Sequence, residues 1–300
     1  MKTFFVALAV LILIVAGGVA IFWEKLPIRL VLPYIKQEPI VMQGEVQKVS
    51  FTVDEAGQQT FFIYLPEGYE NSEEAYSTIY HMHGAFLREP WAGYECEMLG
   101  SKVEEAVTAG IIDPMIVVCL VDPDGDSMWS DGYDGQRQIS TGFIEDLIPY
   151  VDKNYRTIPE RGGRVLQGFS MGGFGAVTNG FRNPDLFSAI LIWDGALHNW
   201  ETITTSRKKI ADKMFASEEY FDQWSPWQLT QDGADVDIDI FMVVGEMKET
   251  TEFGSRFVPH LESIDREFTY YDVACPHSMF CIMDELGTEG FKFIAESLAK

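Results

Sequence analysis

The sequence predicts an α/β protein with a mostly parallel sheet that is covered by helices on both faces. Apolar or alternating runs recur along the chain, and from the third run onward helical patterns lie between them. This alternation is typical of parallel sheets, because each strand is followed by a helix that returns the chain to the same edge. About 260 residues follow the amino-terminal segment, which is enough for one such domain.

Eight runs are predicted to be strands, at residues 46–53, 60–65, 78–82, 115–121, 164–168, 189–193, 238–244 and 268–273. Helical patterns occur at residues 102–109, 141–151, 173–181, 255–263 and 289–298. The long stretch 194–237, with a helical pattern at 206–216, is interpreted either as a cap over the active edge or as ordinary packing. In parallel sheets the loops at the carboxyl ends of the strands carry the chemistry.

Residues 1–23 open the chain with an apolar segment in which positions 4–23 carry no charge. About twenty helical residues at 1.5 Å each span a hydrocarbon core of roughly 30 Å. This length favours a signal-anchor. A cleaved signal peptide is the alternative, because residues 18–20 form a small-residue cleavage site.

Residues 24–44, which are punctuated by prolines, are expected to be a stalk that leads to one domain at 45–300. Three basic residues follow the apolar segment and only Lys2 and the amino terminus precede it, so flanking charge does not settle the orientation. Because the first residues resemble a secretory signal, we expect the domain to be extracytoplasmic and tethered to the cell membrane, or secreted if the signal is cleaved.

Charge and cysteine spacing exclude several classes of partner. The 46 acidic and 22 basic residues give a formal charge of −24, which repels phosphate backbones, so no nucleic-acid partner is expected. The four cysteines show no zinc-type spacing, so no metal site is expected. Cys275 and Cys281 bracket His277, and in an exported protein a disulfide between them would fix the histidine loop. The spacing alone leaves that pairing open.

Residues 168–172 spell GxSxG between an apolar run and a small-residue helical pattern. A strand, a sharp turn and a helix are the setting in which a serine is presented above the carboxyl edge of a sheet. A purely structural glycine turn would not need a serine at its centre. The sequence therefore predicts that Ser170 is a nucleophile.

A serine hydroxyl is a weak nucleophile, so Ser170 needs a histidine that takes its proton and a carboxylate that orients that histidine. His277 directly follows the last predicted strand and is preferred as the base. His198 is the other histidine that follows the serine in a loop, and we interpret it as a loop or pocket residue. This gives the chain order serine, acid, histidine.

The acid is expected at a strand end between the serine and the histidine. The turn after the seventh predicted strand offers Glu246 and Glu249, and Asp194 follows the sixth. Glu249 is preferred, and Asp194 and Glu246 stay open as alternatives.

An oxyanion needs two backbone donors, which we assign to Met171, the residue after the nucleophile, and to Ala85 in the glycine loop after the third strand. His83 in the same loop, together with Trp129 and Tyr133 in the loop after the fourth strand, is predicted to contact substrate. Aromatic side chains with polar tips suit sugar or aryl groups. Simple loop packing is the alternative for these three residues.

Four motifs link these sites, namely the PxGY turn at 65–69, HMHG at 81–84, the stretch 146–157 and GFSMGGFGA at 168–176. In this combination the chain resembles the putative-esterase family, which includes esterase D, feruloyl esterases and the antigen 85 mycolyltransferases. The resemblance runs from about residue 45 to the carboxyl terminus. It implies an α/β-hydrolase fold and a serine esterase with Ser170 as nucleophile and His277 as base.

The chain departs from the family pattern around the other two members of the triad. The family has an aspartate three residues after the glycine that ends the seventh strand, where this chain has Lys248. Around the histidine it has a glycine two residues before and an aromatic residue two residues after, where this chain has Cys275 and Met279. These departures affect the acid and the substrate pocket.

The residues together predict a serine carboxylic-ester hydrolase in which Ser170 attacks the ester carbonyl, His277 shuttles the proton and water resolves the acyl-enzyme. The expected substrate is a small-molecule or polysaccharide-linked ester, and no metal or organic cofactor is expected. Two alternatives stay open. One is an acyltransferase or peptidase with the same triad, and the other is an inactive hydrolase fold that serves as a binding module.

Overall fold

The computed structural model describes residues 40–53, 57–87 and 89–300. Residues Val41–Lys300 form one unit. The predicted membrane segment at 1–23 and most of the predicted stalk at 24–44 lie outside the described residues. Within the described ranges, no helix has the length and apolar character needed to cross a bilayer.

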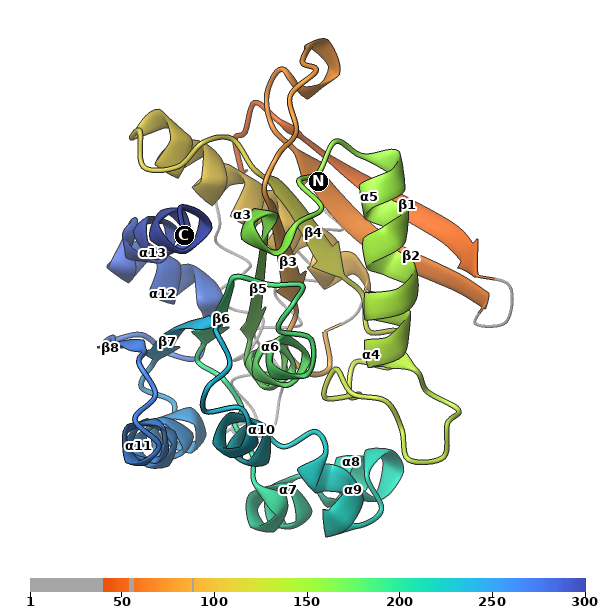
Figure 1. The fold of residues 1–300 in the computed structure, drawn as a ribbon, viewed down its shortest axis with the longest axis vertical. Helices are drawn as coiled ribbons and strands as arrows, with labels where there is room; N and C mark the ends of the chain where they lie inside the picture. The colour runs from red at the N-terminus through yellow and green to blue at the C-terminus, as the bar shows by residue number, and fades with distance from the viewer. Residues whose placement is uncertain (1–39, 54–56, 88) are drawn as a thin grey trace, which may run out of the picture. The chain divides into compact units, whose positions relative to one another are not determined.

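One sheet organises the described unit (Figure 1). Its strands are β1 (Glu45–Val53), β2 (Gly57–Leu65), β3 (Thr78–Met82), β4 (Ile116–Leu120), β5 (Arg164–Phe169), β6 (Ala189–Trp193), β7 (Asp239–Val244) and β8 (Thr269–Asp272). The order is β1-β2-β4-β3-β5-β6-β7-β8; β1–β2 and β2–β4 are antiparallel, and the pairs from β4 to β8 are parallel. The predicted eight-stranded, mostly parallel sheet is confirmed.

The helices connect the strands much as the sequence predicts. They are α3 (Glu89–Thr108), α4 (Ile139–Thr141), α5 (Ile148–Asn154), α6 (Met171–Arg182), α7 (Trp200–Ser206), α8 (Lys208–Met214), α9 (Glu218–Asp222), α10 (Pro226–Asp232), α11 (Lys248–Ser263), α12 (Met279–Leu286) and α13 (Glu289–Leu298). A π-helical segment, Gly142–Leu147, joins α4 to α5. Helix α8 confirms the predicted helix at 206–216, whereas α7, α9, α10 and α12 were not predicted.

Alternating side chains along β6 show that helices cover both faces of the sheet. The α6 backbone lies against Ile190 and Ile192, because a Cβ added at Gly180 would lie 2.5 Å from the Ile190 side chain and one added at Gly173 3.1 Å from that of Ile192. The α13 backbone lies against Trp193 and the intervening Leu191, which are 2.8 Å and 3.8 Å from a Cβ added at Gly290. Successive residues of a strand point to opposite faces, so α6 and α13 lie on opposite sides of the sheet.

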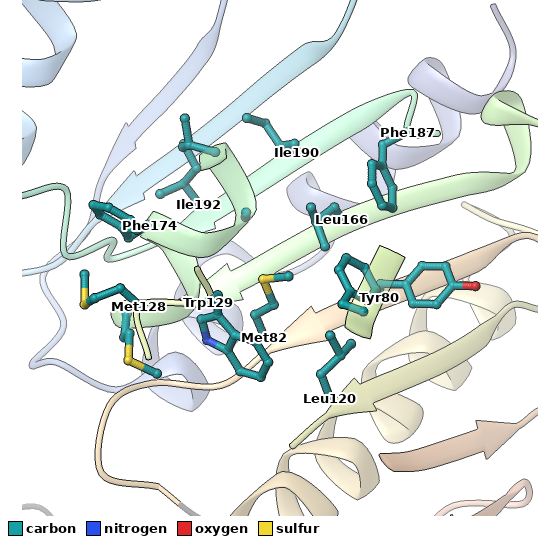
Figure 2. Close-up of a cluster of buried hydrophobic side chains, with 14 of the residues drawn as sticks. Tyr80, Met82, Leu120, Met128, Trp129, Leu166, Phe174, Phe187, Ile190 and Ile192 are labelled. Atoms are coloured by element: carbon teal, nitrogen blue, oxygen red, sulfur yellow. The ribbon is translucent and has the colours of Figure 1, made fainter. Parts of the chain in front are cut away.

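The core under α6 continues across three strands, because Tyr80, Leu166 and Ile190 are register partners on β3, β5 and β6. Figure 2 shows these side chains with Phe174 of α6 and with Trp129, which comes from the loop after β4. All five are fully buried. Burial of each such side chain is worth about 1.5–3 kcal/mol, so this cluster holds the centre of the sheet rigid beneath the carboxyl edge.

The segment between β6 and β7 folds into four short helices, α7 to α10. Helix α10 packs against α6 and α11, and the Trp227 indole donates a hydrogen bond to the Leu197 carbonyl at 3.0 Å. Thr178 of α6 donates to the Trp224 carbonyl at 2.8 Å. These contacts favour the packing interpretation for α10.

Candidate active site

Ser170 lies at the sharp turn between β5 and α6 in a backbone conformation that L-residues rarely adopt, with φ 57° and ψ −115°. The flanking glycines make this turn sterically possible. A Cβ added at Gly168 would lie 2.0 Å from the Gly172 carbonyl oxygen, and one added at Gly172 would lie 1.8 Å from the Met82 carbonyl oxygen. Both glycines are therefore required by close backbone approach, and the strain is concentrated at the serine.

A chain of hydrogen bonds links Ser170 to two residues that are distant in the sequence. His277 Nε2 lies 2.9 Å from Ser170 Oγ, and His277 Nδ1 lies 2.5 Å from Asp194 Oδ2. An ionised carboxylate only accepts hydrogen bonds, so Nδ1 carries the proton and Nε2 is left to accept from the serine hydroxyl. This is the protonation pattern that a general base for Ser170 needs.

Asp194 directly follows the last residue of β6 and is completely buried. Its φ of 46° turns the side chain back toward the sheet edge, a conformation that aspartate tolerates better than most residues. Its Oδ1 accepts a hydrogen bond from the Gly245 amide at 3.0 Å, while Oδ2 accepts from His277. Each carboxylate oxygen therefore has a donor, which compensates the cost of burying the charge.

The preference for Glu249 as the acid is corrected by this geometry. Glu249 lies in the first turn of α11, where its carboxylate pairs with Arg207 at 2.8 Å. Glu246 has an exposed side chain, and its amide donates to the Cys275 carbonyl at 2.7 Å. Neither carboxylate lies at the His277 ring, whereas Asp194, which stayed open as an alternative, does. The sequence signal for Asp194 was its place immediately after a buried strand.

The predicted oxyanion loop lies next to the nucleophile. A Cβ added at Gly84 would lie 3.3 Å from Ser170 Cβ, so the residue before Ala85 touches the serine. Met171 is the first residue of α6, where amides have no acceptor within the helix. The assignment of the Ala85 and Met171 amides as oxyanion donors stays a prediction that is compatible with both positions.

His83 and Trp129 are buried, which corrects the expectation that they contact substrate. His83 Nε2 accepts from the Asp122 amide at 3.0 Å, so its Nδ1 donates to the Gly84 carbonyl at 2.8 Å. The Trp129 indole donates to the His83 carbonyl at 3.0 Å. Burial lowers the pKa of His83 below its usual value and keeps the ring neutral. The two side chains support the oxyanion loop from beneath, whereas Tyr133 is 50% exposed and its substrate contact stays a prediction.

Phe86 is an exposed aromatic residue beside the site that sequence reasoning did not single out. It is 67% exposed, its φ is 63°, and its amide donates to the Gly125 carbonyl at 2.6 Å. An apolar side chain held in a left-handed conformation and facing solvent costs free energy, so a ligand contact is a natural role for it. The available sequence signal was its place two residues after the HG pair.

His198 takes no part in the hydrogen-bond chain. It is buried, its Nδ1 lies 3.3 Å from Thr202 Oγ1, and its ring packs edge-on against Phe253. Burial, with a smaller contribution from Arg207, lowers its pKa to about 3. It is therefore a neutral packing residue at the start of the α7 segment.

Cys275 and Cys281 form a disulfide, whereas Cys96 and Cys119 are buried free thiols. Burial raises the pKa of the Cys119 thiol, which keeps it protonated and unreactive. In the part of the chain that the structure describes, no three His, Cys, Asp or Glu side chains are grouped so as to hold a metal ion.

Comparison with known families and structures shows which family and fold the chain has. A family model described as putative esterase matches residues 56–257. A solved ferulic acid esterase superposes with a TM-score of 0.73 at 19% identity, covering 86% of this chain and 100% of that one. An S-formylglutathione hydrolase from Agrobacterium tumefaciens gives 0.68 at 16% identity, covering 86% and 97%. These likenesses confirm the α/β-hydrolase fold.

The sequence relatives align with a smaller part of this chain than the solved structures do. An endo-1,4-β-xylanase/feruloyl esterase of Xylanibacter ruminicola is 29% identical over 158 residues, which are 49% of this chain and 21% of that protein. An esterase of Mycobacterium tuberculosis is 34% identical over 120 residues, 38% of this chain and 24% of that protein. The aligned part is thus no more than about a quarter of the length of these relatives.

Proposed function

The chain belongs to the putative-esterase family, and from that premise we propose that it is a serine carboxylic-ester hydrolase that forms an acyl-enzyme on Ser170. The observation that carries the proposal is the continuous hydrogen-bond chain from Ser170 through His277 to Asp194. Its three members come from the ends of different strands, and packing of the sheet alone does not require a serine, a histidine and a buried aspartate to converge there.

In the first half-reaction His277 Nε2 takes the proton of Ser170 Oγ while that oxygen attacks the ester carbonyl carbon. The imidazolium that forms is stabilised by the buried Asp194 carboxylate, which stays ionised. The carbonyl oxygen becomes an oxyanion, and the amides of Ala85 and Met171 are the proposed donors to it. His277 then gives its proton to the leaving alcohol, and the acyl group remains on Ser170.

In the second half-reaction water takes the place of the alcohol. His277 accepts a proton from the water as it attacks the acyl-enzyme, and returns that proton to Ser170 Oγ when the acid leaves. The partly exposed His277 side chain, at 15%, gives water a route to the base. Apart from the ester and water, each group that these steps use is a residue of the chain.

The substrate class we propose is a small-molecule or polysaccharide-linked carboxylic ester. Support comes from the solved neighbours and relatives that are described as ferulic acid or feruloyl esterases. The exposed rings of Phe86 and Tyr133 supply apolar surface that an acyl or aryl group can cover.

The proposal is tested by Ser170→Ala, with Ser255→Ala as the matched control because Ser255 is an exposed serine on α11. We expect Ser170→Ala to lose at least about 10³-fold in kcat on a short-chain p-nitrophenyl ester, because the covalent step is removed. It should also fail to react with a fluorophosphonate probe. Retained turnover in a folded Ser170→Ala variant refutes the assignment.

We also propose that the domain is exported and held at the cell membrane by its amino-terminal segment. The uncharged stretch at 4–23 and the disulfide near His277 support this, because disulfides persist in oxidising compartments. Protease treatment of intact cells should digest the domain. Full protection of the domain, with a control surface protein digested, contradicts export.

A further inference from the structure

His277, the proposed base, follows a short edge strand of the sheet. β8 has four residues, pairs with β7 at the end of the strand order, and is half-buried or exposed along its length, whereas every residue of β5 is buried. Such an edge strand contributes little packing to hold the segment that follows it. His277 nevertheless has to keep its two nitrogens within hydrogen-bond reach of Ser170 and Asp194.

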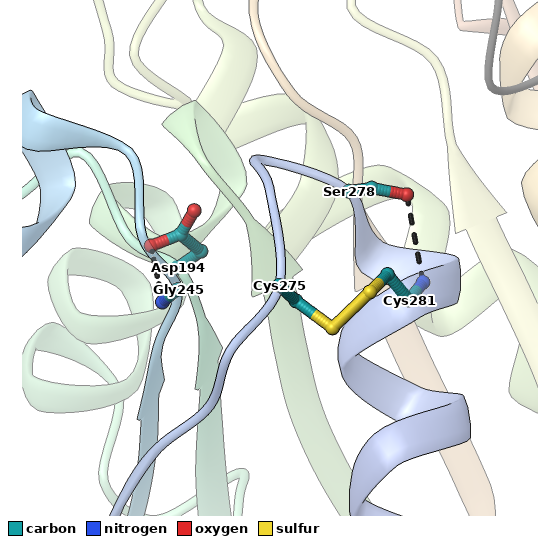
Figure 3. The surroundings of a disulfide bond; sticks show 5 residues. All are labelled: Asp194, Gly245, Cys275, Ser278 and Cys281. Carbon is teal, nitrogen blue, oxygen red and sulfur yellow. Dashed lines mark hydrogen bonds between the residues drawn. A yellow bond between two sulfur atoms is a disulfide. The ribbon is translucent and has the colours of Figure 1, made fainter.

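The disulfide closes a small ring around this histidine. Cys275 and Cys281 are six residues apart, and His277 lies between them. Cys281 is in the first turn of α12, where its amide donates to Ser278 Oγ (Figure 3). The disulfide therefore links Cys275, just before His277, to the first turn of α12, just after it. This restricts the residues between the two cysteines to few conformations.

The Cys275 end of the ring is fixed to the acid. A Cβ added at Gly245 would lie 2.8 Å from the Cys275 carbonyl oxygen and 3.3 Å from Asp194 Oδ2, so Cys275 and Asp194 pack against the same glycine. The Cys275 carbonyl accepts from the Glu246 amide at 2.7 Å, and Asp194 accepts from the Gly245 amide at 3.0 Å. Figure 3 shows Asp194, Gly245 and Cys275 side by side. Cys275 is 1% exposed.

We propose that Cys275 and Cys281 are positioning residues whose disulfide holds His277 in register with Ser170 and Asp194, so that the redox state of this bond sets the turnover of the site. The inference rests on the proposed esterase function and deepens it. A disulfide that only stabilised the fold would not act on one kinetic parameter. This one is proposed to affect the chemical step alone, because the substrate surface at Phe86 and the turn at Ser170 belong to other loops, which do not change when the bond opens.

Opening the bond with dithiothreitol is a balanced exchange. One thiolate of the reagent attacks the sulfur of Cys281, which is less buried than Cys275; the disulfide breaks and Cys275 leaves as a thiolate that takes up a proton. The second thiol of the reagent then attacks the mixed disulfide and releases Cys281. The protein gains two electrons and two protons, and the reagent is oxidised to its cyclic disulfide.

The test compares oxidised and reduced enzyme in the folded state. Native alkylation followed by mass measurement verifies that Cys275 and Cys281 are both modified, while near-ultraviolet circular dichroism verifies that the tertiary structure persists. We expect kcat to fall at least about tenfold with KM within about twofold, since misplacing a base by an ångström costs up to about 10²-fold. Fluorophosphonate labelling of Ser170 should slow in the same proportion, and reoxidation should restore both.

The double variant Cys275→Ser/Cys281→Ser is the matched control. It should show the kcat of the reduced enzyme, and dithiothreitol should change it no further, which excludes an effect of the reagent through Cys96 or Cys119. If this variant does not fold, the kcat of the reduced wild-type enzyme still tests the proposal. Unchanged kcat after complete reduction overturns the proposal, and so does a fall in kcat that comes with a raised KM or lost tertiary structure. An oxidised wild type that neither hydrolyses esters nor reacts with the probe refutes the esterase function itself, and this inference with it.

Discussion

Ser170 and His277 reach the same site from two regions of the sheet that are built differently. Ser170 lies between β5, which is buried throughout, and α6, whose glycines press directly against neighbouring backbone. His277 follows an edge strand whose residues are partly exposed, and it is held by hydrogen bonds and a disulfide. Close packing fixes Ser170, the proposed nucleophile, whereas hydrogen bonds and, as we propose, the disulfide fix His277, the proposed base, so the two regions should fail in different ways.

The nucleophile region should tolerate no added volume. Gly172→Ala places a methyl group 1.8 Å from the Met82 carbonyl oxygen, so the turn has to move or the protein unfolds. We expect a loss of more than about 3 kcal/mol in the free energy of unfolding, measured by urea denaturation. Gly162→Ala is the control, because nothing lies within 4 Å of its Cβ, and should change stability by less than about 0.5 kcal/mol. Equal stability of the two variants contradicts the rigid-turn interpretation.

The base region should lose activity with little loss of fold. Asp194→Asn keeps the side-chain shape but presents an amide where His277 needs an acceptor, so the wrong ring nitrogen becomes protonated. We expect kcat to fall about 10³–10⁴-fold with KM nearly unchanged. Glu249→Gln, which removes the charge that pairs with Arg207, should leave kcat within about twofold. A large fall in kcat for Glu249→Gln, with little change for Asp194→Asn, would identify Glu249 as the acid instead.

Phe86 is an exposed residue of the loop after β3, which packs against Ser170 through Gly84. Phe86→Ala removes an apolar surface beside the oxyanion loop, so KM should rise about threefold to tenfold while kcat stays within about twofold. Val41→Ala is the control, since Val41 is also exposed, at 77%. A series of esters of increasing acyl length should show the largest KM change for the longest chains. If KM is unchanged for every ester in the series, Phe86 does not contact the substrate.

Lowering the pH should destabilise the folded protein because of His83, which lies in the loop after β3. Burial lowers the pKa of His83, so the unfolded chain takes up a proton below about pH 6.5 that the folded protein refuses, and stability falls as the pH drops. We expect the free energy of unfolding to fall as the pH drops from 7.5 to 5 because of this group. His83→Gln keeps an acceptor for the Asp122 amide and should show a smaller slope in urea denaturation across this range. Parallel curves for the two proteins contradict a neutral His83.

The fold was predictable where the hydrophobic pattern of a short segment determines its secondary structure. Central strands such as β4 and β6 are covered on both faces and are therefore continuous apolar runs. Helix α12 was missed because it begins directly after the histidine segment, with no breaker between them. The pattern at 206–216 located α8, whereas α7, α9 and α10 were missed because runs of five to seven residues carry little helical periodicity.

The site was predictable to the extent that it is encoded locally. GxSxG specifies its own turn, and His277 follows from its place after the last strand. The choice among Asp194, Glu246 and Glu249 depends on which strand end faces the histidine and on the left-handed backbone of Asp194, and neither is a property of a short segment. His83 and Trp129 have polar tips that suggested a ligand, but those tips are satisfied by backbone groups inside the loop.

The place of Asp194 has an evolutionary consequence. In the family pattern that the sequence resembles, the carboxylate follows the seventh strand, where this chain has Lys248, whereas the proposed acid, Asp194, follows the sixth. Trp193 of β6 and Val243 of β7 are register partners, and Asp194 accepts a hydrogen bond from the Gly245 amide at 3.0 Å, so Asp194 lies beside the end of the seventh strand. A lineage can therefore transfer the acid from one strand end to the next while its histidine stays in place. Assigning the residue by alignment column would then select a lysine, and only the three-dimensional neighbourhood identifies the homologous role.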